Sequence, residues 1–176
     1  MSLTLWQRLV HFLAYGFGTG LSPIAPGTVG SLVGVLLVWL MAPLAAPLYA
    51  ALTMILFFLG IFICGQTARD LGAKDPGAIV FDEIVGFLVA MYLVPTNWPW
   101  LLGGFLVYRL FDIWKPWPIG AVEEKFGLGT AIMMDDVVAG LYTLALLHMT
   151  KLLRERFSVR FQPVDATHSL NFSAGE

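Results

Sequence analysis

Acidic residues occur as adjacent pairs in this sequence, and each pair adjoins a long apolar run. Asp82 and Glu83 lie between the triplets IVF and IVG, and Asp135 and Asp136 are followed directly by VVAG. Neighbouring side chains on a helix point about 100° apart, so two adjacent carboxylates can face one ion from different directions. Each pair could instead cap a helix N-terminus or complement its dipole. An ionised group at membrane depth costs on the order of 2.5 kcal/mol, so such groups are kept where they are paired, hydrated or functional.

Basic residues accompany a further acid at regular spacing. Arg109, Asp112 and Lys115 follow one another at intervals of three residues, which places them on one face of a helix. A salt-bridge ladder along that helix is the structural alternative. Arginine can grip phosphate oxygens with two N–H groups, and lysine supplies a point charge. Carboxylates from three segments beside these cations predict an oxygen-rich site suited to Mg²⁺ and a phosphate.

The segment SPIAPGTVGS, residues 22–31, offers a second kind of phosphate ligand. Gly27 and Thr28 lie at the expected start of a helix, where free backbone N–H groups and the positive end of the dipole favour an anion. The segment is not a nucleotide-binding P-loop, because the Gly-Lys-Ser/Thr element is missing. A proline–glycine turn with a Thr or Ser cap is the alternative interpretation.

The composition indicates that lipid is the main solvent of this chain. Hydrophobic residues make up 58% of its 176 residues, charged residues only 12%, and the mean hydropathy is +0.78. A soluble domain of this size needs more polar side chains to cover its surface. The one cysteine, Cys64, excludes an internal disulfide. Nucleic-acid binding is not expected, since the only basic cluster is a short one near the C-terminus.

Apolar runs separated by turn-forming residues predict an all-α, polytopic integral membrane protein, a compact bundle of about four to five apolar helices. The runs cover residues 29–39, 48–64, 78–94, 100–114 and 135–148, and the polar, glycine-containing residues 121–134 are expected to form a connector before the last run. Residues 2–15 carry apolar side chains at helical spacing and predict an additional N-terminal amphipathic helix. We expect this segment to be retained, because it does not resemble a cleavable leader. Residues 1–160 are predicted to form one membrane-embedded domain, and 161–176 a disordered tail.

Tracing the predicted helices across the membrane brings the charged clusters to one side. The start of the first run, the loop at 69–75, the segment 109–125 and the pair Asp135–Asp136 all end there. An excess of Arg and Lys on that side predicts that it is cytoplasmic. If all five runs crossed, the basic residues after Thr150 would lie on the opposite side, so the number of complete crossings stays open.

Four stretches of the sequence resemble, in order, the motifs of the phosphatidylglycerophosphatase A family. They are APGTVGS at 25–31, IVFDEIVG at 79–86, YRLFDIWKPWPI at 108–119 and MDDVVAG at 134–140. The resemblance implies a bacterial inner-membrane enzyme that depends on Mg²⁺ and has its active site on the cytoplasmic side. Its implied reaction removes the terminal phosphate of phosphatidylglycerophosphate to give phosphatidylglycerol. The positions it points to are Asp82, Glu83, Asp112, Lys115, Asp135 and Asp136, with Thr28 and Arg109 as supporting ligands.

The resemblance and the residue chemistry together suggest roles for the carboxylates. Asp82, Asp135 and Asp136 would hold Mg²⁺, and Glu83 or Asp112 would orient or deprotonate the attacking water. A covalent aspartyl-phosphate path stays open.

The remaining site residues would bind the substrate. Arg109 and Lys115 are predicted to hold the phosphate, assisted by Thr28 and the backbone of Gly27. Two other functions are open at this point. Intramembrane carboxylates also suit a small transporter or channel, and the spacing of Gly30 and Gly34 suits a non-enzymatic assembly subunit.

Overall fold

The computed structural model describes residues 3–117 and 127–160, and the regular structure in these ranges is entirely helical. Six α-helices and a short 3-10 helix, η1 (Thr19–Leu21), are present there. The α-helices are α1 (Leu5–Ala14), α2 (Pro26–Met41), α3 (Ala46–Leu71), α4 (Phe81–Ala90), α5 (Trp98–Trp114) and α7 (Leu128–Arg160). The predicted all-α fold is confirmed for these residues, and the predicted tail at 161–176 lies outside them.

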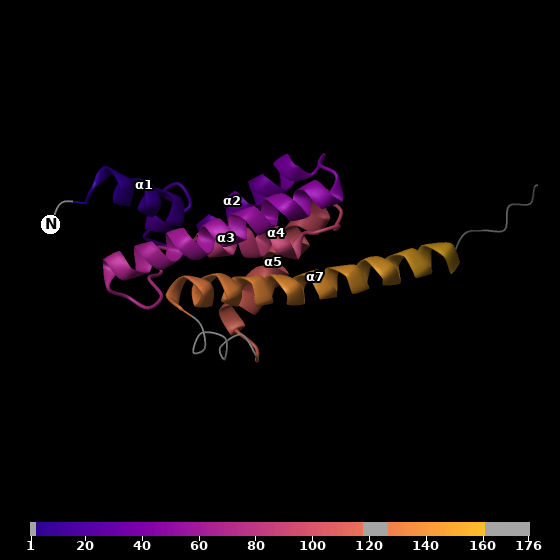
Figure 1. The fold of residues 1–176 in the computed structure, drawn as a ribbon. Coiled ribbons are helices and arrows are strands. Elements are labelled where there is room, and N and C mark those ends of the chain that lie inside the picture. Colours follow the sequence, from indigo (N-terminus) through magenta and orange to yellow (C-terminus); the bar gives the residue numbers. More distant parts are fainter. Residues whose placement is uncertain (1–2, 118–126, 161–176) are drawn as a thin grey trace, which may run out of the picture.

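The short helix α4 lies at the centre of the bundle, in contact with α2, α3, α5 and α7 (Figure 1). Eight of its ten residues are buried. At 1.5 Å per residue it is about 15 Å long, too short to cross a bilayer by itself. The predicted helix over residues 78–94 is therefore wrong in its length: the helix covers only 81–90, and the chain turns at 91–94.

Glycines allow α2 to approach α4 closely. A Cβ atom on Gly30 would lie 2.5 Å from Cβ of Val80, and one on Gly34 would lie 3.1 Å from Cβ of Phe87. Larger residues at these positions would push the two helices apart. The glycine spacing that suggested an assembly subunit is thus used for packing inside this chain.

A second close approach joins α4 to α7. A Cβ atom on Gly86 would lie 2.7 Å from the backbone oxygen of Asp136, and one on Gly140 would overlap the backbone oxygen of Gly86. Gly86 is thus what permits α4 and α7 to pack closely. This contact fixes the position of α7 along the axis of α4, and it thereby places Asp135 and Asp136 beside Asp82 and Glu83.

The helices α7 and α3 extend furthest beyond the ranges predicted from the sequence. α7 begins at Leu128, so Asp135 and Asp136 lie about two turns inside it and do not cap its N-terminus. The residues before them were expected to form a connector, but Met133 is fully buried and packs against Gly60 of α3. This tertiary contact outweighs the polar, glycine-containing character of the segment. α3 likewise continues to Leu71, so the expected loop at 69–75 begins later.

The N-terminal amphipathic helix is confirmed as α1. It begins with a capping box between Thr4 and Gln7, and most of its apolar side chains are exposed. His11, which is buried, holds it to the end of α3 through a 3.0 Å contact between Nε2 and Oδ2 of Asp70.

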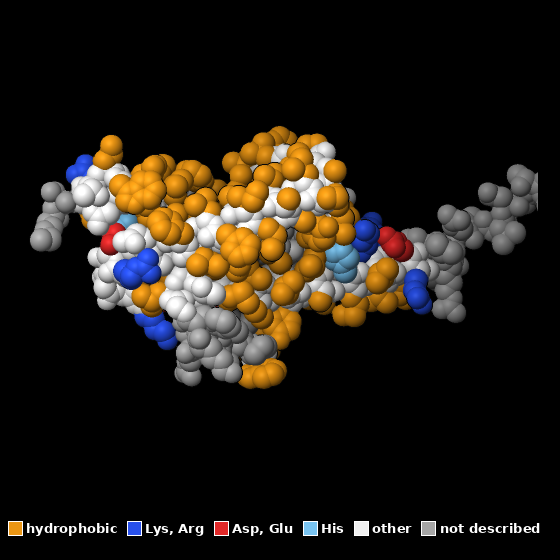
Figure 2. Space-filling model, in the orientation of Figure 1, with side chains coloured by type: hydrophobic (Ala, Val, Ile, Leu, Met, Phe, Trp, Pro, Cys, Tyr) orange, Lys and Arg blue, Asp and Glu red, His pale blue; other side chains and the backbone are white. Residues whose placement is uncertain are grey.

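The surface has an apolar middle and charged ends (Figure 2). α3 and α7 are each long and apolar enough to cross a membrane. Only 33% of the apolar stretch of α3 is buried inside the molecule, so most of it faces outward. α7 has 33 residues and is about 50 Å long, which carries its basic C-terminal turns beyond the bundle (Figure 1).

Candidate active site

The first turn of α4 places two carboxylates at one end of the bundle. Asp82 is buried, and its Oδ1 accepts a hydrogen bond from the backbone N–H of Glu83 at 3.0 Å. Asp82 therefore does accept a backbone hydrogen bond in the first turn of α4, in line with the helix-capping alternative. Asp82 also lines a cavity, so this local hydrogen bond does not account for the whole of its position.

Glu83 is held between α2 and α5. Its Oε1 accepts a hydrogen bond from Nη1 of Arg109 at 3.1 Å. A Cβ atom on Gly27 would overlap the Glu83 carboxylate, with Cδ only 2.7 Å away. A glycine is thus required at position 27, because any side chain there would occupy the space of the Glu83 carboxylate.

Arg109 links α5 to both neighbouring helices. Besides Glu83, its Nη1 donates to Oδ2 of Asp112 at 2.5 Å and lies 3.4 Å from Oγ of Ser31 on α2. The salt bridge between Arg109 and Asp112, which was the structural alternative to phosphate binding, is present. The guanidinium is committed to these partners and does not line the cavity.

The acidic pair of α7 faces α4 and α5. Asp136 is buried, and its Oδ1 accepts a hydrogen bond from the hydroxyl of Tyr108 at 2.6 Å. Asp135 forms an ion pair with Lys115, which ends α5 in a left-handed conformation with φ of 45°. Lys115 therefore reaches across to α7.

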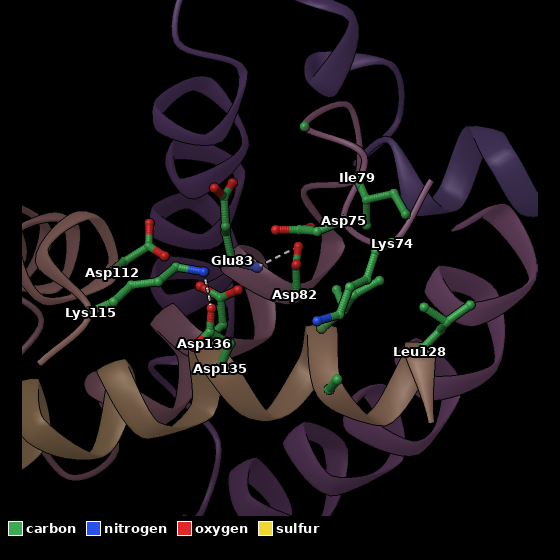
Figure 3. Close-up of a pocket in the computed structure, with 13 residues that line it drawn as sticks. Lys74, Asp75, Ile79, Asp82, Glu83, Asp112, Lys115, Leu128, Asp135 and Asp136 are labelled. Carbon is green, nitrogen blue, oxygen red and sulfur yellow. Dashed lines mark hydrogen bonds and ion pairs between the residues drawn. The ribbon is translucent and has the colours of Figure 1, made fainter. Parts of the chain in front are cut away.

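These side chains surround a cavity of about 210 Å³ between α4, α5, α7 and the loop before α4 (Figure 3). Six of its lining residues were predicted as site residues: Asp82, Glu83, Asp112, Lys115, Asp135 and Asp136. The convergence predicted from the helix order is thus what the structure has. Gly27, Thr28 and Arg109 do not line the cavity. Gly27 and Arg109 lie directly behind Glu83, whereas Thr28 is a half-buried residue in the first turn of α2.

Burial makes the carboxylates of α4 difficult to ionise. It raises the pKa of Asp82 well above its usual range. It also raises the pKa of Glu83 to about 7, although the Arg109 guanidinium opposes this shift. Further positive charge is needed to keep both groups ionised at neutral pH.

The donor set fits a hydrated divalent cation. Six carboxylates line the cavity beside two lysines, and Arg109 adds a third cation behind it, so acidic groups outnumber basic ones by three. In the described ranges, no group of three acidic side chains is close enough to form a complete metal cage. Mg²⁺ is usually held by one or two carboxylates together with waters and phosphate oxygens, so it does not require such a cage. Oε2 of Glu83 is buried without a hydrogen-bond partner, which leaves an oxygen for a further ligand.

Three residues of this site have no role predicted from the sequence. Lys74 and Asp75, assigned only to a polar loop, line the cavity. The available signal was the position of this charged pair shortly before the helix that carries Asp82 and Glu83. Tyr108 was quoted within a motif but given no role, and its bond to Asp136 on another helix has no signature in local spacing.

Comparison with known proteins identifies the group to which this chain is related. Residues 12–151 match the family described as phosphatidylglycerophosphatase A. The phosphatidylglycerophosphatase A of Escherichia coli K12 is 44% identical over 139 residues, which are 78% of this chain and 81% of that protein. The Haemophilus influenzae protein of the same name is 43% identical over 135 residues, 76% of this chain and 83% of its own.

A third relative carries a different name. A Bacteroides thetaiotaomicron protein described as a candidate phosphatidylinositol-3-phosphatase is 37% identical over 144 residues, 77% of this chain and 89% of that protein. No solved structure resembles the chain closely enough to count as a match. The four motifs predicted this relationship, and the match extends over most of the length of both chains. This chain belongs to the phosphatidylglycerophosphatase A family.

Proposed function

We propose that this protein hydrolyses the terminal phosphomonoester of phosphatidylglycerophosphate, releasing phosphatidylglycerol and phosphate. Family membership makes it a phosphatase, and the names of its E. coli and H. influenzae relatives support this substrate. The observation that carries the proposal is the cavity with six carboxylates and two lysines at one end of an apolar helix bundle. Such a site can take up a charged headgroup while the rest of the molecule stays in lipid.

The proposed cofactor is Mg²⁺, which would be held by one or two of the carboxylates Asp82, Asp135 and Asp136 together with waters and phosphate oxygens. When bound, it would neutralise charge developing on the phosphate oxygens and lower the pKa of a bound water. The cavity's excess of negative charge supports the proposal, because a phosphate would otherwise be repelled.

The residues of the chain would divide the other tasks. Glu83 or Asp112 orients the attacking water and accepts its proton, and both lie within reach of the cavity. Lys115 binds the phosphate as a point charge. Arg109 is better suited to holding Glu83 and Asp112 in place than to binding substrate, because its guanidinium already bridges them. Thr28 stays a prediction from the motif.

The proposed location is the bacterial inner membrane, with several crossings and the cavity on the cytoplasmic side. The outward-facing apolar side chains of α3 and α7 support embedding in lipid. α2, at about 24 Å, and α5, at about 26 Å, are candidates for two further, short crossings. α4 would then be a buried helix inside the bundle that does not cross.

A transporter or channel is not favoured. The charged side chains lie at one end of α4, while its other end is surrounded by an apolar cluster that includes Phe87, Met91 and Leu101. A cation pathway through the bundle would need polar groups along its length.

The names of the relatives point to one class of lipid. Phosphatidylglycerophosphate and phosphatidylinositol 3-phosphate each carry a phosphodiester that joins the headgroup to the lipid, and a separate phosphomonoester. We infer that this chain likewise acts on lipids with two phosphate groups.

The test is phosphate release from phosphatidylglycerophosphate by the purified protein in detergent, with and without Mg²⁺, beside the Asp136→Asn variant. We expect Mg²⁺-dependent release by the wild type and at least a thousandfold less by the variant, which should remain folded because Asn can still accept the Tyr108 hydrogen bond. Absence of release under any divalent metal would refute the phosphatase proposal. Equal release with and without metal would refute the cofactor.

A further inference from the structure

Lys74 extends into the active-site cavity from the loop between α3 and α4. It lines the cavity together with Asp75, and it is exposed to solvent. The close-up shows Lys74 and Lys115 on opposite sides of the acidic side chains, with Asp82 and Asp136 between them (Figure 3). The cavity thus offers cationic groups at two separate places.

The cations differ in how far they are already committed to carboxylates. Arg109 bridges Glu83 and Asp112, and Lys115 is paired with Asp135. Lys74 makes no ion pair with any carboxylate in the part of the chain that the structure describes. Its ammonium group is therefore the best placed of the three to bind a new anion without first breaking an internal pair.

A lipid with two phosphate groups could place one phosphate near Lys115 and the other near Lys74. The phosphomonoester must lie at the acidic side chains, where water and metal would act on it, and Lys115 is already paired with one of them, Asp135. The phosphodiester is attached a short distance away along the headgroup. A lysine on an exposed loop, with a flexible stem and a compact charge, is suited to meet it at the mouth of the cavity.

We propose that Lys74 binds the phosphodiester of the substrate and so selects lipids with two phosphates over lipids with a phosphomonoester alone. This inference rests on the proposed phosphatase function and deepens it. Phosphatidic acid has the phosphomonoester and lacks the diester, so it is the lipid that Lys74 would discriminate against.

The experiment compares Lys74→Gln with the wild type in two measurements. The KM for phosphatidylglycerophosphate should rise about tenfold with little change in kcat, which is the size expected for one lost charge-assisted contact. The inhibition constant of inorganic phosphate, which imitates only the monoester, should stay the same. Phosphatidic acid should become a relatively better competitor by the same factor.

Two further variants separate recognition from structural effects. Lys74→Arg keeps a positive charge on the same loop and should restore the KM to within about threefold of the wild type. Lys151→Gln makes the same chemical change at the far end of α7 and should alter neither constant.

Each outcome decides the matter. If Lys74→Gln weakened the binding of inorganic phosphate as much as that of the lipid, Lys74 would contact the phosphomonoester, and its assignment to the phosphodiester would be wrong. An unchanged KM would also overturn it. If the wild type released no phosphate, the failure would lie with the proposed function and not with the role of Lys74.

Discussion

The Glu83 carboxylate occupies the space that a side chain on Gly27 would need. A Cβ atom at position 27 would overlap the carboxylate, and Cδ of Glu83 would be 2.7 Å from it. The motif APGTVGS therefore contributes to the site by the absence of a side chain. This contact ties the first turn of α2 to the first turn of α4.

Replacing Gly27 by Ala should displace Glu83 from Arg109. We expect at least a tenfold loss of phosphatase activity and a loss of roughly 1–3 kcal/mol in stability from overpacking. Both can be measured on detergent-solubilised protein, by phosphate release and by thermal unfolding. The matched control is Gly103→Ala on α5, where a Cβ atom would meet nothing within 4 Å. That variant should be as active as the wild type, and full activity of both variants would contradict the packing argument.

Tyr108 should act as a positioning residue for Asp136. The Tyr108 hydroxyl donates a hydrogen bond of 2.6 Å to Asp136, and both side chains are buried. The Tyr108→Phe variant leaves a buried carboxylate without this donor, which costs about 1–3 kcal/mol. Loss of a partner that orients the carboxylate proposed to bind Mg²⁺ should also lower activity by roughly 10–100-fold.

A second buried tyrosine gives the control for this prediction. The Tyr49 hydroxyl donates to the backbone oxygen of Leu88 at 2.8 Å, away from the active-site cavity. Tyr49→Phe should lose comparable stability and keep its activity. If both variants lost activity in proportion to their stability, Tyr108 would have only a structural role.

The sequence could predict where the charged groups meet but not how they pair. Apolar runs and their turns were enough to place Asp82, Asp112 and Asp136 at one end of a bundle, because helix order alone decides which ends lie together. The partner of each group depends on helix rotation and height, which the close contact of Gly86 with α7 sets. Spacing along one helix suggested that Lys115 extends the Arg109–Asp112 ladder, yet Lys115 pairs with Asp135 on another helix.

The helix boundaries predicted from the sequence are wrong where tertiary packing outweighs the local amino-acid composition. The polar, glycine-containing sequence at 121–134 predicts a connector, but residues 128–134 form the first turns of α7, and 121–126 lie outside the described residues. In the folded chain, a Cβ atom on Gly129 would overlap the backbone of α3 at Ile61, so the glycine is what lets α7 start against α3. No pattern within the segment itself carries that information.

Arg109 should matter for turnover more than for substrate binding. Its Nη1 contacts both Glu83 and Asp112, at 3.1 Å and 2.5 Å. Lysine keeps the positive charge, but its single ammonium nitrogen cannot hold the carboxylates of Glu83 and Asp112 in the geometry that the guanidinium sets. We therefore expect Arg109→Lys to lower kcat by at least tenfold while the KM changes by less than threefold. A raised KM with an unchanged kcat would instead support the phosphate-binding role predicted from the sequence.

The two charged ends of the molecule should lie on opposite sides of the membrane. Ala73, just after the C-terminal end of α3, and Glu155, near the C-terminal end of α7, are both exposed. These two helix ends lie at opposite ends of the molecule (Figure 1), whose middle is apolar (Figure 2). α7 is about 50 Å long, against a hydrocarbon thickness of about 30 Å, so one crossing suffices to separate the active site from its basic end.

Single cysteines at these positions can test the arrangement. The native Cys64 is fully buried, so the unmodified protein should not react with a membrane-impermeant thiol reagent. Ala73→Cys should be labelled only in inverted membrane vesicles, and Glu155→Cys only in intact spheroplasts. Labelling of both from the same side would mean that α7 returns or lies along the surface. The active site would then have to reach its lipid without α7 crossing the membrane.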